Sequence, residues 1–284
     1  MRVPWTLARR SSALAFVCLL VLGRSGLMGI FQGTTANSLL FGRLPLADPA
    51  TALEVSLASD SWPKTLWLGA GLVALATLAL GPVFCGWVCP LSQLLEGVRS
   101  LRRRTPPSRQ ASSNPVTRRA ILLCFLAIAL VGVLPLHAAL SPVHCLSRSI
   151  AAGLDITITI TITGCVLVAE FIRPHLWCKH LCPMGAVYGP LGRRAPLRVH
   201  LDPQTAGRTL CGLCTTHCPA GIPVMERFAQ ERRPWIDDEL CTRCGACVDA
   251  CPKGVLRLSF NSTPWRQRSG PSRAKELVEG CSGH

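Results

Sequence analysis

Four long apolar stretches constrain this 284-residue sequence more than any other feature. A helix needs roughly 20 apolar residues to cross the ~30 Å hydrocarbon core of a bilayer, and each stretch has about that length. The sequence is 49% hydrophobic and only 16% charged, whereas a soluble domain carries about 25% charged residues. The pattern predicts an all-α integral membrane domain over residues 1–199 with four transmembrane helices, near Ser11–Phe31, Trp62–Phe84, Arg119–Leu140 and Ile150–Ile172.

The fourth stretch alternates Ile and Thr strictly over residues 156–163, a pattern typical of a β-strand in a soluble protein. In a bilayer a lone strand leaves its backbone polar groups unsatisfied. A helix satisfies its own, and its Thr hydroxyls can bond a carbonyl one turn back. We therefore expect a helix here.

The basic residues predict an orientation. Residues 1–10, 85–119 and 173–284 carry net charges of +3, +6 and +7, and the connecting segments between them sum to about zero. The positive-inside rule then places both termini in the cytoplasm of a multi-pass protein of the cell inner (cytoplasmic) membrane. The first stretch follows Arg9-Arg10 and has no clean cleavage site, so we expect an uncleaved anchor with flanking charge. The net charge of +15 is thus explained by the orientation of the chain in the membrane. With only 6% aromatic residues, we expect no nucleic-acid partner.

The strongest chemical signal is Cys241-x2-Cys244-x2-Cys247-x3-Cys251-Pro252. Bacterial-type ferredoxins hold [4Fe-4S] clusters with this spacing, whereas structural zinc sites pair two Cys-x2-Cys knuckles across a longer gap. The spacing predicts a small α+β ferredoxin-like 4Fe-4S domain over residues 200–260, followed by a flexible basic tail over 261–284.

Upstream, Cys211-x2-Cys214-x3-Cys218-Pro219 matches the last three cysteines of the same motif, and Arg208 occupies the position of the missing first cysteine. In two-cluster ferredoxins the fourth cysteine of a motif ligates the other cluster. Crossed ligation predicts a complete site formed by Cys218 with Cys241, Cys244 and Cys247. The other site has Cys211, Cys214 and Cys251 and lacks one ligand.

The incomplete site has three alternatives: a 3Fe-4S cluster, a cubane completed by a non-cysteine or distant ligand, or no stable cluster. Candidate fourth ligands are His217, Asp202 and Cys281. His217 is more simply interpreted as a solvated loop residue.

A second pair of cysteine motifs lies at the predicted inner ends of the second and fourth spans. Residues 84–91 (FCGWVCPL) and 177–184 (WCKHLCPM) align without a gap. Two facing pairs would supply four thiolates to a second metal site or form a redox-active dithiol relay, from Cys85, Cys89, Cys178 and Cys182. The structural alternative is that each Cys-Pro marks where the spanning helix ends and the chain turns along the surface.

The other polar residues of the spans receive simpler interpretations. Asp155 and Glu170 lie near span ends, where we expect water to reach them, and Arg24 is a further charge within a span. Trp177 and His180 lie beside Glu170 on the predicted inner side, where a quinone headgroup or a proton exit would fit.

Two histidines and four isolated cysteines remain. His137 and His144 could ligate haem only with further histidines at the same depth, which the sequence lacks, so we interpret them as interfacial polar residues. The isolated cysteines are interpreted as small packing residues: Cys18, Cys124, Cys145 and Cys165.

With these motifs in view, the chain resembles the NapH/MauN family of membrane-bound ferredoxin-type proteins. The likeness includes residues 37–41 (NSLLF), 45–49 (PLADP), 84–91 and 177–189. The resemblance implies electron transfer, in the NapH branch from membrane quinol toward periplasmic nitrate reductase. The MauN branch belongs to methylamine utilisation, in which methylamine dehydrogenase is made and used. Arg208, where the NapH pattern has a cysteine, favours the MauN branch.

We therefore expect an electron-transfer component serving methylamine utilisation, through maturation or function of methylamine dehydrogenase. The expected partners are redox proteins, among them a periplasmic ferredoxin or dehydrogenase maturation proteins. The alternatives are a quinol dehydrogenase subunit and an assembly factor or membrane anchor with structural clusters.

Overall fold

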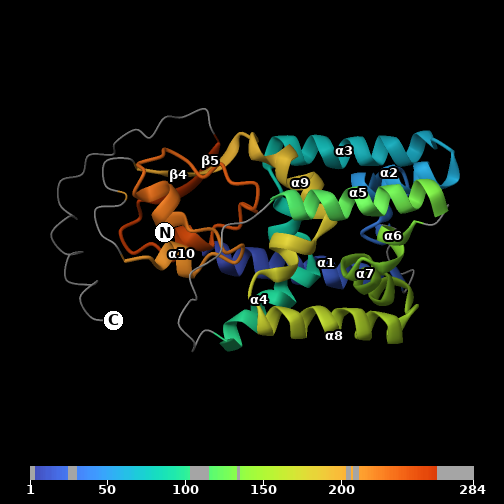
Figure 1. The fold of residues 1–284 in the computed structure, drawn as a ribbon, viewed down its shortest axis with the longest axis horizontal. Helices are drawn as coiled ribbons and strands as arrows, with labels where there is room; N and C mark the ends of the chain where they lie inside the picture. Colours follow the sequence, from blue (N-terminus) through green and yellow to red (C-terminus); the bar gives the residue numbers. More distant parts are fainter. Residues whose placement is uncertain are drawn as a thin grey trace.

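The computed structural model describes residues 4–24, 31–102, 115–132, 135–202, 206 and 211–260. A helical bundle occupies one end of the molecule, and a smaller cysteine-rich part occupies the other (Figure 1). Arg208, Cys281 and the tail over 261–284 lie outside the described residues.

The bundle consists of two consecutive halves with the same order of elements. The first half has α1 (Trp5–Arg24), α2 (Pro49–Ser59), α3 (Lys64–Leu80), the π-helical turn η1 (Phe84–Val88) and α4 (Pro90–Arg102). The second half repeats this order with α5 (Pro115–Gly132), α7 (Pro142–Ala152), α8 (Ile156–Ile172), the π-helical turn η2 (Trp177–Leu181) and α9 (Pro183–Arg193). The matching elements α2 and α7 have 11 residues each, and α3 and α8 have 17. The repeat therefore extends far beyond the two cysteine motifs.

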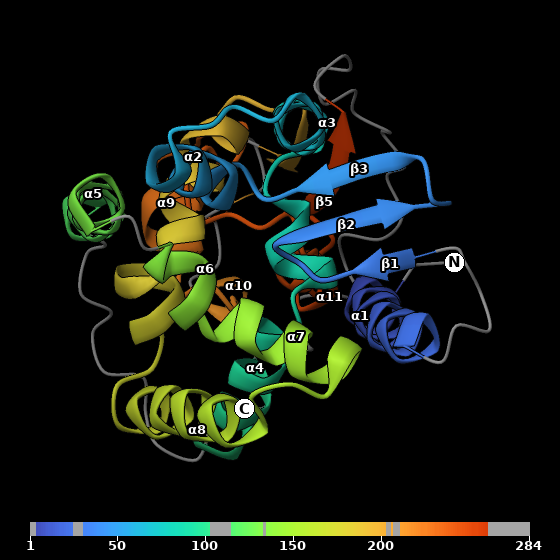
Figure 2. The same cartoon turned by 90° about the vertical axis from the view of Figure 1, so that its right-hand side faces the viewer.

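The helices of each half pack against helices of the other half. Helix α7 of the second half packs on α1, as α2 of the first half packs on α5. In the same way α4 packs on α8, and α9 packs on α3. Figure 2, viewed along the bundle, shows these neighbours together. The reciprocal packing relates the halves by an approximate two-fold exchange, which brings equivalent positions of the two halves toward one another.

The core of each predicted span is helical, but the bounds differ from those predicted: α1 ends at Arg24, Phe31 begins a strand, and residues 153–155 separate α7 from α8. The number of helices that lie in a membrane is not shown. Residues 156–163 lie in α8, and Thr161 Oγ1 donates to the Thr157 carbonyl one turn back at 2.8 Å. Trp5–Gly23 is the one helix of the described residues that is long and apolar enough to cross a membrane by length and composition. Helices α3 and α8 are apolar but shorter, because each ends before its cysteine turn.

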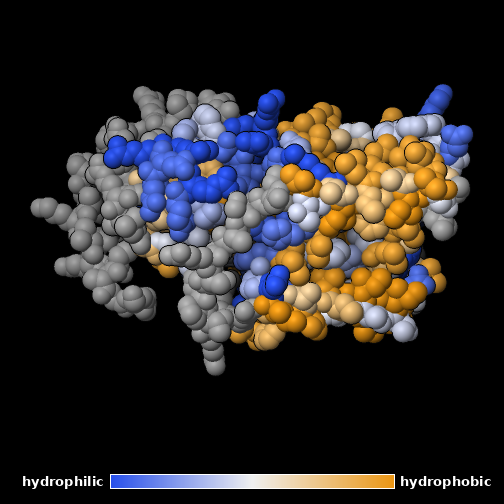
Figure 3. All heavy atoms as spheres, viewed as in Figure 1, coloured by the Kyte–Doolittle hydropathy of each residue, from blue (hydrophilic) through white to orange (hydrophobic). Residues whose placement is uncertain are grey.

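The outer surface of the bundle is strongly apolar. Figure 3 shows hydrophobic residues over the bundle and hydrophilic residues gathered on the cysteine-rich part. Leu14, Leu75, Leu123 and Ile160, on four different long helices, are 64%, 63%, 64% and 67% exposed. Soluble monomers rarely expose such extensive apolar surface, so this surface suits contact with lipid.

The expectation that residues 1–199 are all helical is wrong between α1 and α2. Strands β1 (Phe31–Gly33), β2 (Asn37–Leu40) and β3 (Leu44–Ala47) form an antiparallel sheet in that order. The sheet packs closely on α3, where a Cβ added at Gly69 would lie 3.0 Å from the Ala47 nitrogen. A short helix, α6 (Leu136–Leu140), lies at the corresponding place in the second half.

The cysteine-rich part is held by an antiparallel pair, β4 (Leu197–Leu201) and β5 (Leu256–Phe260). Between these strands lie α10 (Leu213–Thr216), the π-helical turn η3 (Met225–Ala229) and α11 (Ala246–Asp249). The β4 strand begins three residues before the domain boundary expected at residue 200.

Helix α1 joins the two parts. The backbone N–H groups of Trp5 and Thr6 donate to the Asp249 carboxylate at 3.1 and 2.7 Å. Gly245 has φ +74°, and a Cβ there would lie 2.5 Å from the Trp5 Cβ, so the close approach requires glycine. The ferredoxin-like part is thus docked directly on one end of the bundle.

Candidate iron–sulfur sites

The two Cys-x3-Cys-Pro motifs adopt the same local structure. The backbone N–H of Cys89 donates to the Phe84 carbonyl, and that of Cys182 donates to the Trp177 carbonyl, both at 2.9 Å. Each bond closes a π-helical turn, a feature frequent at functional sites, and the following proline begins the next helix. Each Cys-Pro therefore ends a turn, as the structural alternative expected, and each turn also places its two cysteines at the same pocket.

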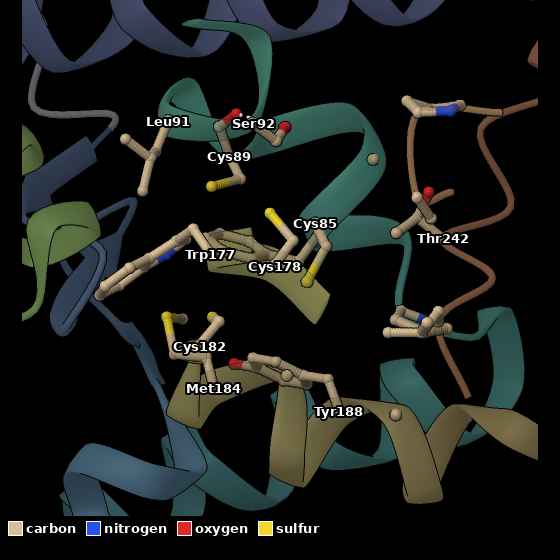
Figure 4. A pocket seen from close by; sticks show the side chains of 18 of the residues that line it. Cys85, Cys89, Leu91, Ser92, Trp177, Cys178, Cys182, Met184, Tyr188 and Thr242 are labelled. Atoms are coloured by element: carbon tan, nitrogen blue, oxygen red, sulfur yellow. Dashed lines mark hydrogen bonds between the residues drawn. The ribbon is translucent and has the colours of Figure 1, made fainter. Parts of the chain in front are cut away.

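Four cysteines of these turns surround one space, flanked by Trp177, Met184 and Tyr188 (Figure 4). They are Cys85, Cys89, Cys178 and Cys182, and we call this the membrane-edge site. None of the described cysteines forms a disulfide. Burial, reinforced by the neighbouring thiols, raises the pKa of Cys182 to about 12, and burial raises the pKa of Cys89 to about 12.

A metal centre fits this set of side chains. Buried thiols with such a high pKa become thiolates only beside a strong positive charge, which a metal centre supplies. In addition, the Trp177 Nε1–H lines the pocket and is buried without a hydrogen-bond partner among the described residues. A cluster sulfide or other acceptor in the pocket would satisfy it.

Buried ion pairs support the membrane-edge site. Glu170 is 1% exposed and accepts from Arg99 Nε at 2.6 Å, so the expectation that water reaches this carboxylate is wrong. It also accepts from the backbone N–H of His175 at 2.6 Å and of Trp177 at 3.2 Å, which fixes the start of η2. Arg9 is likewise buried and paired with Glu96, so it is more than a flanking charge. Asp155 is the partly exposed charge we expected, beside Arg148 at 3.6 Å.

The ferredoxin-like part contains two further cysteine-lined pockets. Cys218, Cys241, Cys244 and Cys247 line one of them, which we call the complete site. Cys211, Cys214 and Cys251 line the other, which we call the three-cysteine site. The structure thus brings together the two sets that crossed ligation predicts. Burial, followed by the nearby Cys244 thiol, raises the pKa of Cys218 to about 12.

The fourth ligand of the three-cysteine site is not among the described residues that line its pocket, which include no further Cys and no His, Asp or Glu. His217 is exposed, and its Nδ1 lies 3.0 Å from the Leu213 carbonyl oxygen, as expected for a loop residue. Asp202 does not line the pocket. The two remaining positions of interest, Arg208 and Cys281, lie outside the described residues.

One layer of residues separates the membrane-edge site from the complete site. Pro219, Ala220 and Thr242 line both pockets. The contact is close, because a Cβ added at Gly86 would lie 2.8 Å from the Thr242 carbonyl oxygen. Beyond it, Cys247 of the complete site is near enough to Cys214 of the three-cysteine site for that thiol to help raise the Cys247 pKa. The three sites therefore form a continuous series.

Comparisons with known proteins match these same regions. The family described as "4Fe-4S dicluster domain" matches residues 209–256, and a second of that description matches 233–283. The family described as "4Fe-4S binding domain" matches residues 64–108 and 156–201, so it covers each cysteine turn once. The ferredoxin-type protein NapH of Haemophilus influenzae is 34% identical over 218 residues, which are 74% of this chain and 73% of that protein. This chain belongs to the NapH/MauN family of ferredoxin-type proteins.

Both branches of the NapH/MauN family are represented among the relatives. The methylamine utilization ferredoxin-type protein MauN of Paracoccus denitrificans is 32% identical over 238 residues, 82% of each chain. NapH of Escherichia coli is 33% identical over 72% of this chain and 71% of its own length. No solved structure matches the chain.

Several residues of this family member lie in other surroundings than the sequence predicted. Cys145 is fully buried, as a packing residue should be, but three of the isolated cysteines are exposed on the outside of the bundle, namely Cys18, Cys124 and Cys165. His137 and His144 are not interfacial, since they are 1% and 2% exposed. Their burial is set by the packing of α6 and α7, which a single sequence does not reveal.

Proposed function

We propose that this family member is a membrane-bound iron–sulfur protein that passes single electrons along its three cysteine sites. The observation that carries the proposal is the shared wall of Pro219, Ala220 and Thr242 between the membrane-edge site and the complete site. An iron–sulfur cluster accepts or gives one electron, and its potential depends on nearby hydrogen bonds, charge and solvent exposure. Sites separated by one layer of side chains suit transfer from one cluster to the next.

In this proposal Cys85, Cys89, Cys178 and Cys182 hold one [4Fe-4S] cluster, and the complete site holds another. The three-cysteine site holds a 3Fe-4S cluster or a cubane with a further ligand. The clusters supply the electron acceptors. The protein holds the membrane-edge cluster by four thiolates from two halves of the bundle, excludes water from it by burial, and places the Arg99 and Arg118 guanidinium groups at its pocket.

We propose further that α1, α3, α5 and α8 span the cytoplasmic membrane with both termini inside. The exposed apolar surface of these helices and the positive charge of the inner segments support this placement. The membrane-edge site then lies at the inner boundary of the bilayer, beside the docked ferredoxin-like part.

The decisive experiment counts clusters in anaerobically purified protein by iron and sulfide analysis and by EPR during redox titration. Cys178→Ser should remove about four iron atoms and one signal while the signals of the ferredoxin-like part remain. The matched control is Cys165→Ser, because Cys165 is exposed on α8 and lines none of the three pockets. Equal iron content and unchanged spectra in Cys178→Ser would refute a cluster at the membrane edge.

Oxidation of a quinol is a second candidate for the membrane-edge pocket. Its lining combines aromatic and apolar side chains with the unpartnered Trp177 Nε1–H and two buried ion pairs, which would suit a polar headgroup on an apolar body. Added menadiol should then reduce the clusters in purified membranes. If the clusters stay oxidised with menadiol but accept electrons from dithionite, the quinol role fails while the relay stands.

We propose that the protein serves methylamine utilisation. The support is that Arg208 stands where the NapH pattern has a cysteine, and that MauN proteins are among the relatives. A deletion strain should lose growth on methylamine as nitrogen source and active methylamine dehydrogenase. Normal growth with active dehydrogenase would leave the nitrate-linked alternative. An assembly role with structural clusters predicts instead that Cys244→Ser removes the whole protein from the membrane.

A further inference from the structure

A second cluster of ligating side chains lies in the bundle, apart from the cysteines. Asp48, His137 and His144 are 2%, 1% and 2% exposed. The Nε2 atoms of the two histidines lie 3.7 and 3.8 Å from Asp48 Oδ2, and one ligating atom from each of the three residues lies within 4.8 Å of the others. The two imidazole rings meet edge to face, with centroids 5.3 Å apart.

The cluster is built where the two halves of the bundle meet. Asp48 caps α2, and His144 lies in the first turn of α7, the matching helix of the second half. Thr51 in α2 occupies the position equivalent to His144, and its Oγ1 lies 3.2 Å from His144 Nε2. Sites at the interface of internal repeats are formed by both halves at once, as the membrane-edge site also is.

One ligand of the cluster, His137, makes no side-chain hydrogen bond within the described residues. Both ring nitrogens of His137 are buried without a hydrogen-bond partner among the described residues. Nearly all buried polar atoms in proteins are paired, so a buried imidazole whose Nε2 faces a carboxylate points to a bound group. The backbone N–H of His137 is itself held by Glu54 Oε1 at 2.6 Å, which fixes the position of this ring.

The carboxylates at this place have no Lys or Arg partner among the described residues, and two histidines lie 3.7 and 3.8 Å from Asp48 Oδ2. Asp48 accepts from the Thr51 backbone N–H at 3.0 Å, the Thr51 hydroxyl at 2.9 Å and the Tyr188 hydroxyl at 2.8 Å. Among the described residues, the fully buried Glu54 accepts from the backbone N–H groups of His137 and Ala138 at the start of α6. Within the described residues no Lys or Arg lies within 4.0 Å of either carboxylate. Two buried carboxylates with neutral donors favour a divalent cation nearby.

We propose that Asp48 Oδ2, His137 Nε2 and His144 Nε2 bind a divalent first-row transition metal ion, separate from the iron–sulfur sites. Ligands at bond lengths of about 2.0 to 2.1 Å in tetrahedral geometry stand about 3.4 Å apart. Each histidine Nε2 therefore needs to approach Asp48 Oδ2 by only a few tenths of an ångström, from 3.7 and 3.8 Å. Two histidines and one carboxylate suit zinc and ferrous iron. His144 Nδ1 lies 3.0 Å from Thr35 Oγ1, the outer partner that orients a metal-binding imidazole.

The test uses zinc as the probe, because iron is already present in the clusters. Full-length protein, purified anaerobically in detergent with its clusters intact, is equilibrated with Zn²⁺ and desalted, and zinc is measured by mass spectrometry. We expect one zinc per chain in the natural sequence, and its loss in Asp48→Asn and in His144→Gln. The matched control is His200→Gln, which changes another buried histidine whose Nε2 lacks a partner but which has no carboxylate beside it, and it should retain the zinc.

Unchanged iron–sulfur absorption in each variant verifies that the chain has folded. If either ligand variant fails to fold, Thr35→Val still decides, because it keeps all three ligands and removes the hydroxyl that bonds His144 Nδ1 and Ser147 Oγ. It should weaken zinc binding about 10- to 100-fold. Zinc absent from the natural sequence, or retained equally by the ligand variants and the control, would overturn the proposal. The histidines and the carboxylate would then be a plain hydrogen-bonding cluster.

Discussion

Replacement of Glu170 tests how the membrane-edge site is held. This carboxylate, with a fully buried side chain, accepts from Arg99 and from two backbone N–H groups at the start of η2. Glu170→Gln keeps the shape of the side chain but removes its charge, so the Arg99 guanidinium is left buried without a negative partner. Breaking a buried pair in this way costs about 3 to 5 kcal/mol. With roughly 2 to 4 °C for each kcal/mol in a chain of this size, we expect Tm to fall by about 6 to 20 °C.

The matched control lies at the other end of the same helix. Asp155 and Arg148 are 3.6 Å apart with side chains 45% and 32% exposed, and such exposed pairs contribute at most about 1 kcal/mol. Asp155→Asn should therefore lower Tm by no more than about 4 °C. Both variants are heated at one fixed scan rate in detergent under anaerobic conditions, with tryptophan fluorescence and cluster absorbance as the two signals, because membrane proteins often unfold irreversibly.

A double substitution separates the charge effect from packing. If the unpaired guanidinium is the cause, Arg99→Met combined with Glu170→Gln should be no less stable than Glu170→Gln alone, because the buried charge is gone. Equal shifts in Glu170→Gln and Asp155→Asn would refute the reasoning. So would an additive loss of stability in the double variant.

Three further predictions follow from the sites. Cys218→Ser should remove the complete cluster, although Cys218 lies in the upstream motif, whereas Cys251→Ser should affect only the three-cysteine site; EPR that shows the opposite assignment would exclude crossed ligation. Asp249→Ala removes the acceptor for the first N–H groups of α1, costs about 1 kcal/mol, and should speed amide hydrogen exchange at residues 5–10; unchanged exchange would contradict the docking. Burial, with help from the nearby Arg99 charge, lowers the pKa of His175 from near 6.5 to about 3, so the unfolded chain binds more protons and stability should fall as pH drops below about 6.5. In denaturant titrations, His175→Asn should reduce the change of the free energy of unfolding with pH. The same change with pH in both proteins would count against a role of His175 in it.

The cysteine sets of the complete and three-cysteine sites could be predicted, because the spacing of cysteines along the sequence indicates which of them can bind one cluster. Three thiolates at Cys-x2-Cys-x2-Cys reach one cluster whatever surrounds them, and the crossed fourth ligand follows from the way two motifs fold against each other. The helix at residues 156–163 could be predicted for a different reason, since a bilayer leaves a lone strand unsatisfied. Both arguments need only the chain and its solvent.

The burial of Glu170, His137 and His144 could not be predicted in this way, because it depends on helices distant in the sequence. The sheet of β1 to β3 was also missed, since its strands are three or four residues long and lie between two stronger helical signals. One signal for the larger repeat was present. Pro49 and Pro90 are 41 residues apart, and so are Pro142 and Pro183, so the spacing of the prolines extends the cysteine repeat back to α2 and α7.

The packing of the helices of each half against the other half has a consequence for biogenesis. Cys85 and Cys89 leave the ribosome long before their partners, since Cys182 follows Cys89 by 93 residues. At a synthesis rate of about 5 to 20 residues per second, the first pair waits roughly 5 to 20 s for the second. During that interval the early thiols lack the second pair with which they form the site, and they are open to oxidation. If the membrane-edge site holds the cluster proposed above, iron and sulfide must reach it after translation of both halves, and the cell has to keep the nascent chain reduced until then.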